Sequence, residues 1–369
     1  MKIGILTYHR AENYGALLQA YALKTYLEYF LGYNVEFVDY WPEYHSEFYN
    51  LFSYNTFRKR NIKGKLYYLF VYVVRFFSKV TRKKKLQRFM HQYLGLSKCP
   101  LYTETSCKTE RYDAVIYGSD QIWRKQHLGG VEFDSWYFGS DNIIADRKIV
   151  YAGSMGSIAN NSEDEDYLKK MMNNFDSISV RERDLQDYLG KFDVCSTLVN
   201  DPVFLLSKEE WRRIEEKPKN KGKYIVFYNL LLTKESESFA LELSKKTGLP
   251  LYEINYKSLF PRHGVNLVRA ASIEQFVGLI DNAEYVVSNS FHGVALSLIL
   301  EKQFFAVGFG KRANRVVSLL NRLDIIDRYS ECGVGNLDFR PINYQDVKKR
   351  IDAFVRQSVN YLNISLHQN

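Results

Sequence analysis

Residues Val286 to Leu300 read V-V-S-N-S-F-H-G-V-A-L-S-L-I-L, and this stretch decides the fold class of the chain. The apolar run that ends at Val287 predicts a buried strand, because β-branched side chains suit the pleat of a sheet. From Gly293 the apolar residues recur closely enough to predict a helix that is buried on most of its surface. We therefore expect His292 in a strand-to-helix turn at the carboxyl edge of a parallel sheet, where α/β proteins bind ligands.

The polar neighbours of His292 favour a functional histidine. A single histidine is most simply a structural residue that satisfies its own hydrogen bonds. Here Ser288, Asn289 and Ser290 directly precede the strand-to-helix turn that holds it, and a glycine follows. Both interpretations stay open, and the polar surroundings favour the functional one.

The next predicted strand, 304–307, ends in a turn with cations. Residues 308–312 read G-F-G-K-R, and Arg315 follows at the start of a predicted helix. Helix N-termini and nearby cations bind phosphate and carboxylate groups. Lys311, Arg312 and Arg315 are therefore candidate ligands of an anionic substrate.

Composition and the order of predicted elements indicate two globular α/β domains. The chain has 369 residues, of which 46% are hydrophobic and 25% charged, as in globular rather than disordered proteins. Predicted strands lie at 2–7, 35–38, 112–117, 148–152, 177–180 and 194–199, and then at 224–228, 251–254, 285–287 and 304–307. The fold class that we expect is α/β with two Rossmann-like domains. The strand-turn-helix-strand pattern at the start of the chain lacks the G-x-G-x-x-G of a dinucleotide site.

The domain boundaries follow from a polar stretch with proline and glycine. Residues 215–223 read E-E-K-P-K-N-K-G-K, which predicts an interdomain linker. We expect an N-terminal domain at 1–214, a C-terminal domain at 224–342, and a last helix within 343–369 that packs back across both.

The basic excess of the chain lies in one segment. The chain holds 51 Lys and Arg against 42 Asp and Glu, a net charge of +9. From 48 to 103 there is no acidic residue, yet there are thirteen Lys and Arg, so that 38 basic and 42 acidic residues remain elsewhere. Within it, 66–74 is apolar and aromatic but far shorter than the about 20 residues that span a bilayer. We expect a helical insertion of the N-terminal domain.

Three interpretations of this insertion are open. Aromatic residues interleaved with Lys and Arg, and the run Arg82-Lys83-Lys84-Lys85, favour the surface of an anionic membrane. One alternative is an insertion that packs its aromatic residues on the main domain. Nucleic acid is the third, which the apolar character of the segment disfavours.

The four cysteines form neither a C-x-x-C pair nor a metal-binding spacing. They indicate reduced thiols in a cytoplasmic protein, and we expect no metal site. Met1 leads directly into an apolar run at 3–6, without the pattern of a secretory signal.

Two strand ends of the first domain carry candidate polar ligands. Asn13, Tyr14 and Gly15 open a predicted helix, where backbone N–H groups can meet a sugar or phosphate; an ordinary turn is the alternative. Arg181 directly follows the strand 177–180 and suits an anion, or else an ion pair with a neighbouring acid.

A third strand end has the composition of a carbohydrate site. Asp120, Gln121 and Trp123 follow the strand 112–117. A carboxylate and an amide bind sugar hydroxyls, and an indole ring packs on the face of a sugar. We therefore expect this turn to hold the acceptor.

Five motifs in chain order resemble the polysaccharide pyruvyl transferase family: N-Y-G-A at 13–16, G-S-D-Q-I-W at 118–123, V-R-E at 180–182, D-P at 201–202 and S-F-H-G at 290–293. The resemblance implies a GT-B-like chain with its active site in the cleft between two domains. It also implies transfer of a pyruvyl group from phosphoenolpyruvate to two hydroxyls of a sugar, as a cyclic ketal with loss of phosphate. No cofactor is implied. Some members carry Arg-Leu-His in place of Ser-Phe-His, so the arginine ligand must come from elsewhere in this chain.

The expected roles follow from this chemistry. His292 is the candidate general acid, and Asp120 deprotonates or orients the acceptor. The expected donor ligands are Arg181, Ser290, Asn289, Lys311, Arg312 and Arg315, and the expected acceptor ligands are Asn13, Tyr14, Gly15, Gln121 and Trp123.

The expected chemistry and the basic segment together predict where the protein acts, and two other functions stay open. We expect an acceptor on a polyprenyl diphosphate lipid, met by a peripheral enzyme on the cytoplasmic face of the membrane during capsule or exopolysaccharide synthesis. One rival is a GT-B glycosyltransferase with a nucleotide-sugar donor, because fold alone does not fix activity. The other is a non-catalytic, membrane-associated assembly protein.

Overall fold

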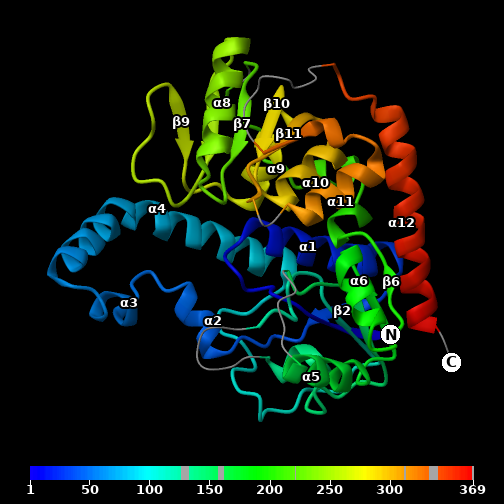
Figure 1. Ribbon diagram of the computed structural model, residues 1–369. Helices are drawn as coiled ribbons and strands as arrows, with labels where there is room; N and C mark the ends of the chain where they lie inside the picture. Colours follow the sequence, from blue (N-terminus) through cyan, green and yellow to red (C-terminus); the bar gives the residue numbers. More distant parts are fainter. Residues whose placement is uncertain (126–132, 157–161, 221, 311–312, 332–339, 368–369) are drawn as a thin grey trace. The chain divides into compact units, whose positions relative to one another are not determined.

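The computed structural model describes residues 1–125, 133–156, 162–220, 222–310, 313–331 and 340–367 (Figure 1). The chain divides into two compact units. The first unit comprises 1–44, 90–206 and 344–369, and the second comprises 45–89 and 207–343.

The first unit is built on a parallel sheet of six strands in the order β2-β1-β3-β4-β5-β6. The central strand β3 is buried at every residue, as expected of a strand that is covered on both faces. The edge strand β2 alternates exposed and buried residues. The strands are β1 (Lys2–Leu6), β2 (Asn34–Phe37), β3 (Ala114–Tyr117), β4 (Lys148–Gly153), β5 (Ser177–Val180) and β6 (Thr197–Leu198).

Helices connect these strands. The first helix, α1, continues into a π-helical turn at Tyr26–Phe30, and Gly32 follows with a φ of 71°, as expected of a glycine that ends a helix. The last helix, α12, packs against β4 through the bond that the Tyr361 hydroxyl donates to Val150 O, at 2.7 Å. The helices of this unit are α1 (Tyr14–Thr25), η2 (Ser135–Phe138), α5 (Ser162–Met172), α6 (Arg183–Gly190), η3 (Pro202–Leu205) and α12 (Tyr344–His367).

The second unit has its own parallel sheet of six strands, in the order β12-β11-β10-β7-β8-β9. The stretch that predicted the fold class forms the centre of this sheet, because β10 pairs with both β7 and β11. The strands are β7 (Ile225–Tyr228), β8 (Leu251–Ile254), β9 (Val265–Val268), β10 (Tyr285–Ser288), β11 (Gln303–Val307) and β12 (Tyr329–Ser330).

The helices of the second unit pack on this sheet and on each other. Helix α8 contacts β8, β10 and β11, whereas α10 contacts β10, β11 and its neighbours α9 and α11. They are α7 (Lys208–Arg213), α8 (Lys234–Thr247), α9 (Ile273–Asp281), α10 (Phe291–Ile299), α11 (Asn314–Leu323) and η5 (Ile326–Arg328). Two parallel Rossmann-like sheets in one chain confirm the predicted α/β, GT-B-like fold class.

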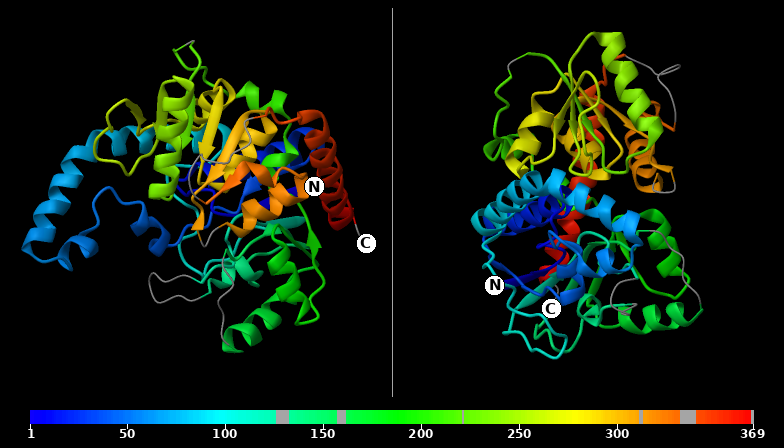
Figure 2. Two further views of the ribbon diagram at one scale, coloured as in Figure 1. Left: turned by 45° about the horizontal axis from the view of Figure 1, so that its top comes forward. Right: turned by 90° about the vertical axis from the view of Figure 1, so that its left-hand side faces the viewer.

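The basic segment is helical. Helix α2 (Glu43–Phe48) leads into it, and it contains α3 (Tyr54–Arg58) and the long helix α4 (Ile62–Leu94). Figures 1 and 2 show α3 beside the N-terminal half of α4, where the Phe57 and Tyr68 rings lie 5.9 Å apart. The sequence placed this insertion in the N-terminal domain, whereas residues 45–89 divide with the second unit.

The boundary between the units also differs from the predicted linker. The chain passes from the first unit to the second between Leu206 and Ser207, before 215–223. Helix α7 packs on α9, and Arg212 donates to both oxygens of Asp281, at 2.7 and 3.1 Å. The polar composition of this stretch reflects a mostly exposed surface at 216–220 and 222–223, and Glu216 N donates to Glu274 O of α9.

Candidate functional site

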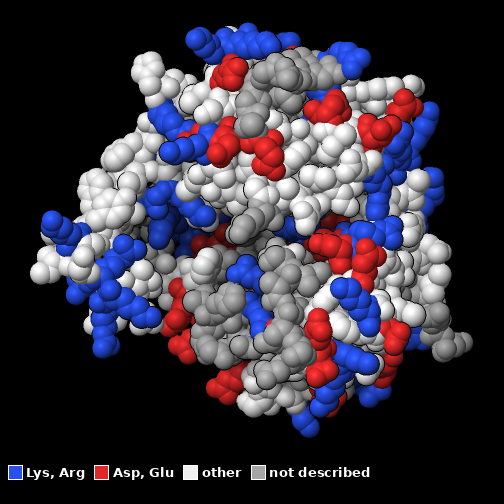
Figure 3. Space-filling view, in the orientation of Figure 1, with Lys and Arg blue, Asp and Glu red and all other residues white. Residues whose placement is uncertain are grey.

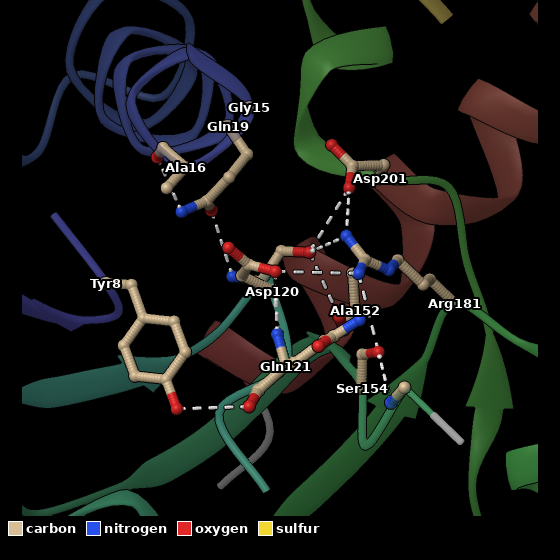
Figure 4. Close-up of polar contacts among 12 residues, drawn as sticks. Tyr8, Gly15, Ala16, Gln19, Asp120, Gln121, Ala152, Ser154, Arg181 and Asp201 are labelled. Atoms are coloured by element: carbon tan, nitrogen blue, oxygen red, sulfur yellow. Dashed lines mark hydrogen bonds and ion pairs between the residues drawn. The ribbon is translucent and has the colours of Figure 1, made fainter. Parts of the chain in front are cut away.

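Polar residues from four adjacent strand ends converge in the first unit (Figure 4). They cluster at the carboxyl edge of the parallel sheet, where ligand sites of such sheets form. The members are Ser119 and Asp120 after β3, Ser154 after β4, Arg181 and Glu182 after β5, and Asp201 after β6.

Arg181 is the centre of this cluster. Its guanidinium Nη1 lies 2.5 Å from Asp201 Oδ2, and its Nε lies 2.9 Å from Glu182 Oε1. The third carboxylate, of Asp120, lies 3.8 Å from Nη2. Burial alone lowers the pKa of Arg181, but attraction to these three acids more than offsets it and raises the pKa above its ordinary value.

This geometry favours the ion-pair interpretation of Arg181 over donor binding. Its side chain is 2% exposed, and two carboxylates already accept from it. A guanidinium held in this way positions the strand ends rather than meeting an incoming anion.

Asp120 is the member of the cluster that reaches solvent. Its side chain is 20% exposed, against 5% for Glu182 and 0% for Asp201. Its backbone has a φ of 74°, a left-handed conformation that is uncommon outside glycine and often found at functional sites. Gly118, two residues earlier, has a φ of 113°, and an added Cβ would lie 2.4 Å from Tyr151 O. The turn therefore holds an accessible carboxylate in a fixed place.

The neighbours of Asp120 divide between the surface and the core. Gln121 is half-buried, and among the described residues its side-chain amide has no hydrogen-bond partner. Trp123 is fully buried; its indole N–H donates to Tyr137 O at 3.0 Å, and Phe138 stacks 6.1 Å from its ring. This placement favours a core role for Trp123 over the expected contact with a sugar.

The N-terminus of α1 is largely satisfied from within. The Asn13 side chain accepts from Gly15 N at 2.9 Å, and Asn13 N donates to Ala11 O at 2.8 Å. Tyr14 is buried at the first position of the helix. The structure therefore favours the ordinary capped turn that was the alternative for these three residues.

In the second unit, Asn289 joins two strand ends. Its Oδ1 accepts from Leu230 N at 2.7 Å and Leu231 N at 3.2 Å, in the loop after β7. Its Nδ2 donates to Asn229 Oδ1 at 3.1 Å and to Ser236 Oγ at 3.0 Å. All four hydrogen bonds that an amide side chain can make are thus used, which favours a positioning role over donor binding.

Ser290 and His292 lie at the N-terminus of α10. Ser290 is the N-cap residue, and among the described residues its hydroxyl makes no capping bond. The His292 ring lies perpendicular to the Phe291 ring, at 5.4 Å between centroids. The Arg315 guanidinium lies 5.7 Å from the same Phe291 ring. The structure thus places an imidazole and a cation against one aromatic ring, and a serine hydroxyl at the N-cap of the same helix.

Two expected donor ligands, Lys311 and Arg312, lie outside the described residues. The turn before them is described: Gly308 has a φ of 71°, and an added Cβ would lie 2.5 Å from Thr233 Oγ1.

The basic run after the apolar part of α4 is mostly engaged within the protein. Arg82 is buried with its guanidinium 4.3 Å from the Tyr256 ring. Lys83 donates to Tyr49 O, and Lys85 donates to Ala270 O and Gln275 Oε1. Only the side chain of Lys84 is exposed, so these four residues do not form the free basic patch that the sequence indicated.

Within the described residues, no group of three His, Cys, Asp or Glu side chains is arranged to hold a metal ion. In the same part of the chain, no helix is both long enough and apolar enough to cross a membrane.

Comparison with known protein families gives one decisive match. The model of the polysaccharide pyruvyl transferase family matches residues 13–310. The chain belongs to this family. Membership supports a transferase role in polysaccharide biosynthesis, and the match covers strand ends of both sheets.

Solved structures give more distant likenesses. The family member resembles the E. coli heptosyltransferase WaaC with ADP, at 12% identity over 96% of this chain and 99% of that one, with a TM-score of 0.42. It also resembles the UDP-GlcNAc 2-epimerase from Neisseria meningitidis bound to UDP-GlcNAc, at 11% identity over 99% and 94%, with a TM-score of 0.47. A third is the glycosyltransferase SnogD from Streptomyces nogalater, at 8% identity over 98% and 96%, with a TM-score of 0.40. A search of curated proteins finds no match.

Four members of the Arg181 cluster received no role from the sequence. Each follows a strand of the sheet within three residues, which was the one signal that could have grouped them. The buried Gln19 of α1 was also missed; it accepts from Ser119 N at 3.2 Å and donates to Thr7 Oγ1 at 2.9 Å, and so fixes the turn that carries Asp120. The four cluster members are Ser119, Ser154, Glu182 and Asp201.

Proposed function

We propose that this member of the family transfers a pyruvyl group from phosphoenolpyruvate to two hydroxyls of one sugar, as a cyclic ketal. The observation that carries the proposal is the family match over residues 13–310. It includes the polar strand ends that follow β3, β5 and β10.

The donor side of the reaction needs groups that bind phosphate and carboxylate. We assign this role to Ser290 at the N-cap of α10, to Arg315, whose guanidinium lies against the Phe291 ring, and to Lys311 and Arg312. The start of α10 adds backbone N–H groups of a helix N-terminus, which favour anions. Asn289 and Arg181 are positioning residues in this proposal.

The acceptor side needs a group that takes or orients a hydroxyl proton. We assign this role to Asp120, the most exposed carboxylate of its cluster, with the half-buried Gln121 beside it. Glu182 and Asp201 hold Arg181 in place beside it.

The chemistry proceeds through protonation of the donor. His292 gives a proton to the CH₂ carbon of the enol, which becomes the methyl group, and an oxocarbenium-like centre forms at the next carbon. One sugar hydroxyl adds to this centre, the bond to phosphate breaks, and the second hydroxyl closes the ketal. One hydroxyl proton replaces the proton that His292 gave, and the other leaves with phosphate.

The basic, aromatic segment 48–103 supports a lipid-linked acceptor. A sugar chain on a polyprenyl diphosphate lipid presents its end at an anionic membrane surface, to which a peripheral enzyme with such a segment can bind. We propose this acceptor class and a peripheral location on the cytoplasmic face, in capsule or exopolysaccharide synthesis.

The test is phosphate release from phosphoenolpyruvate with a galactose- or mannose-terminated lipid-linked acceptor. Release is expected to need the acceptor and to fall about 100-fold or more in His292→Ala. The matched control is His263→Ala, an exposed histidine of the same unit, which should keep full activity. No release with any acceptor, together with thermal protection by a nucleoside diphosphate, would point instead to a glycosyltransferase.

A further inference from the structure

An apolar stripe runs along the N-terminal half of α4. Exposed large apolar side chains follow one another at intervals of three and four residues, which places them on one face of the helix. No residue of α4 from 62 to 80 is buried. The stripe consists of Ile62 (79% exposed), Leu66 (64%), Leu69 (40%), Phe70 (49%), Val73 (67%) and Phe77 (81%).

The opposite face of the same helix is covered by the chain that leads into it. The Phe52 ring lies 5.3 Å from the rings of both Tyr68 and Tyr72. Ser53 N donates to the Tyr68 hydroxyl at 2.9 Å, and Lys79 donates to Leu51 O at 3.3 Å. Because these contacts fix the rotation of α4 about its axis, the stripe is held outward.

A second element extends the stripe. Phe260, in the loop between β8 and β9, is 58% exposed, and its ring lies 6.4 Å from the Phe70 ring. Arg269 anchors this loop by donating to Ser258 O at 3.0 Å. An apolar surface built from two elements is typical of an interaction site rather than of scattered exposed residues.

Positive charge surrounds the stripe. Residues 48–103 contain no Asp or Glu, and the exposed side chains of Lys59, Arg60, Lys63 and Lys84 lie before, within and after the stripe. Figure 3 shows Lys and Arg gathered beside uncharged surface over α3 and α4, at the left of the view. Apolar residues flanked by cations match an anionic membrane surface, which accepts both.

We propose that this face of α4, residues 62–77 with Phe260, is the surface by which the protein binds anionic lipid bilayers. The helix lies in the plane of the headgroups, with the stripe toward the acyl chains and the lysines among the lipid phosphates. A second copy of the chain is disfavoured as occupant, because it would bring two uniformly positive surfaces together. Nucleic acid would leave the six apolar side chains without a role.

This surface replaces the run 82–85 as the membrane contact. Arg82 and Lys85 are held by Tyr256, Ala270 and Gln275 and are not free to reach lipid. This membrane contact rests on the proposed function only in that a lipid-linked acceptor gives the enzyme a reason to bind a membrane. Vesicle binding is measured without phosphoenolpyruvate or acceptor, so its failure is distinguishable from a failure of pyruvyl transfer.

The test is flotation of the full chain with vesicles of phosphatidylcholine and phosphatidylglycerol, against vesicles of phosphatidylcholine alone. The wild type is expected to bind the anionic vesicles, and Leu66→Ser/Val73→Ser/Phe77→Ser to bind them about tenfold or more weakly. Lys59→Gln/Lys63→Gln, which removes two exposed lysines beside the start of the stripe, is expected to weaken binding about tenfold and to reduce its dependence on salt.

Matched controls separate the stripe from exposed apolar surface in general. Tyr29→Ser/Leu101→Ser/Leu241→Ser removes three exposed apolar side chains elsewhere, and Lys348→Gln/Lys349→Gln removes two exposed lysines of α12. Both should bind vesicles like the wild type, and all variants should keep its melting temperature. Equal vesicle binding by the stripe variant and the wild type would overturn the proposal. It would also be overturned if the wild type bound no vesicles and the stripe variant changed only its oligomeric mass or its RNA binding.

Discussion

Arg181 and Asp201 form an ion pair in which Nη1 and Oδ2 lie 2.5 Å apart and both side chains are buried. Removing one partner leaves the other charge buried without compensation. We therefore expect Arg181→Ala to lower the free energy of unfolding by about 3–5 kcal/mol, because Asp201 and Glu182 both lose their cation. Urea unfolding followed by circular dichroism measures this loss.

The neighbouring Arg183 supplies the control. Its exposed guanidinium donates to Gln186 on the same helix, so Arg183→Ala should change stability by no more than about 0.5 kcal/mol. If Arg181→Ala unfolds like the wild type and instead raises the KM for phosphoenolpyruvate, Arg181 is a donor ligand.

Asn289 and Ser290 are adjacent but should respond differently to truncation. Asn289→Ala removes four hydrogen bonds that tie the loop after β7 to the end of β10, and we expect a loss of about 2–4 kcal/mol. Ser290→Ala should alter stability by less than about 0.5 kcal/mol but raise the KM for phosphoenolpyruvate several-fold. Thermal unfolding and steady-state kinetics of the two variants together test both roles. Equal stability losses in the two variants would contradict the assignment.

Gly293 is required by the close packing of α10 on its own sheet. An added Cβ would lie 2.3 Å from Ser288 Oγ and 2.9 Å from Tyr228 Cδ1. We expect Gly293→Ala to cost about 1–3 kcal/mol in unfolding free energy, as overpacking does. The control is Gly190→Ala at the end of α6, where no atom lies within 4 Å of the new Cβ. If both variants lost the same unfolding free energy, close packing around Gly293 would not be the reason that this position needs a glycine.

The position of His292 was predictable, whereas its neighbours' partners were not. The change from a strand pattern to a helix pattern lies within a few residues and needs no tertiary information, and β10 and α10 begin and end close to the predicted bounds. The role of Asn289 depends on Leu230, a residue 59 positions earlier in the chain, which no local pattern indicates.

The strands β9 and β12 and the buried position of Trp123 could not be predicted from the sequence, for related reasons. Strand β9 is an edge strand with one buried residue in four, and β12 has two residues, so neither shows the apolar run by which strands are recognised. Trp123 follows a strand end as a sugar-binding residue would, but η2 supplies Tyr137 and Phe138 to cover it. The sequence cannot indicate which side of a turn a later segment will cover.

Arg82 and Lys84 lie in one basic run but in different environments. Arg82 is buried over the Tyr256 ring, and we expect Arg82→Gln to lower the free energy of unfolding by about 1–2 kcal/mol through loss of this cation–π contact and its packing. Lys84→Gln at the exposed position should leave unfolding unchanged within about 0.5 kcal/mol. Chemical denaturation of both variants measures these changes in the free energy of unfolding. A stable Arg82→Gln protein would mean that this guanidinium is free for another partner.

Asp39 should make the stability of the first unit sensitive to acid. Burial raises the pKa of this carboxyl, but hydrogen bonds from Arg10 and His9 outweigh burial and hold the pKa below its ordinary value. A carboxyl with a lowered folded-state pKa contributes stability that is fully present above the unfolded pKa, about 3.9, and is lost as the pH falls through the folded value.

Asp39→Asn is therefore expected to be about 3 kcal/mol less stable than the wild type at pH 7, because Arg10 then lacks its buried partner. This difference should persist to pH 5 and narrow below about pH 4, where Asp39 in the unfolded wild-type chain begins to bind a proton while the folded protein still holds it ionised. Urea midpoints at pH 7, 5 and 3.5 measure the change, with the exposed Asp187→Asn as a control that should follow the wild type throughout. A difference that stays constant down to pH 3 would show that the lost stability comes from packing at this position and not from the charge of the carboxylate.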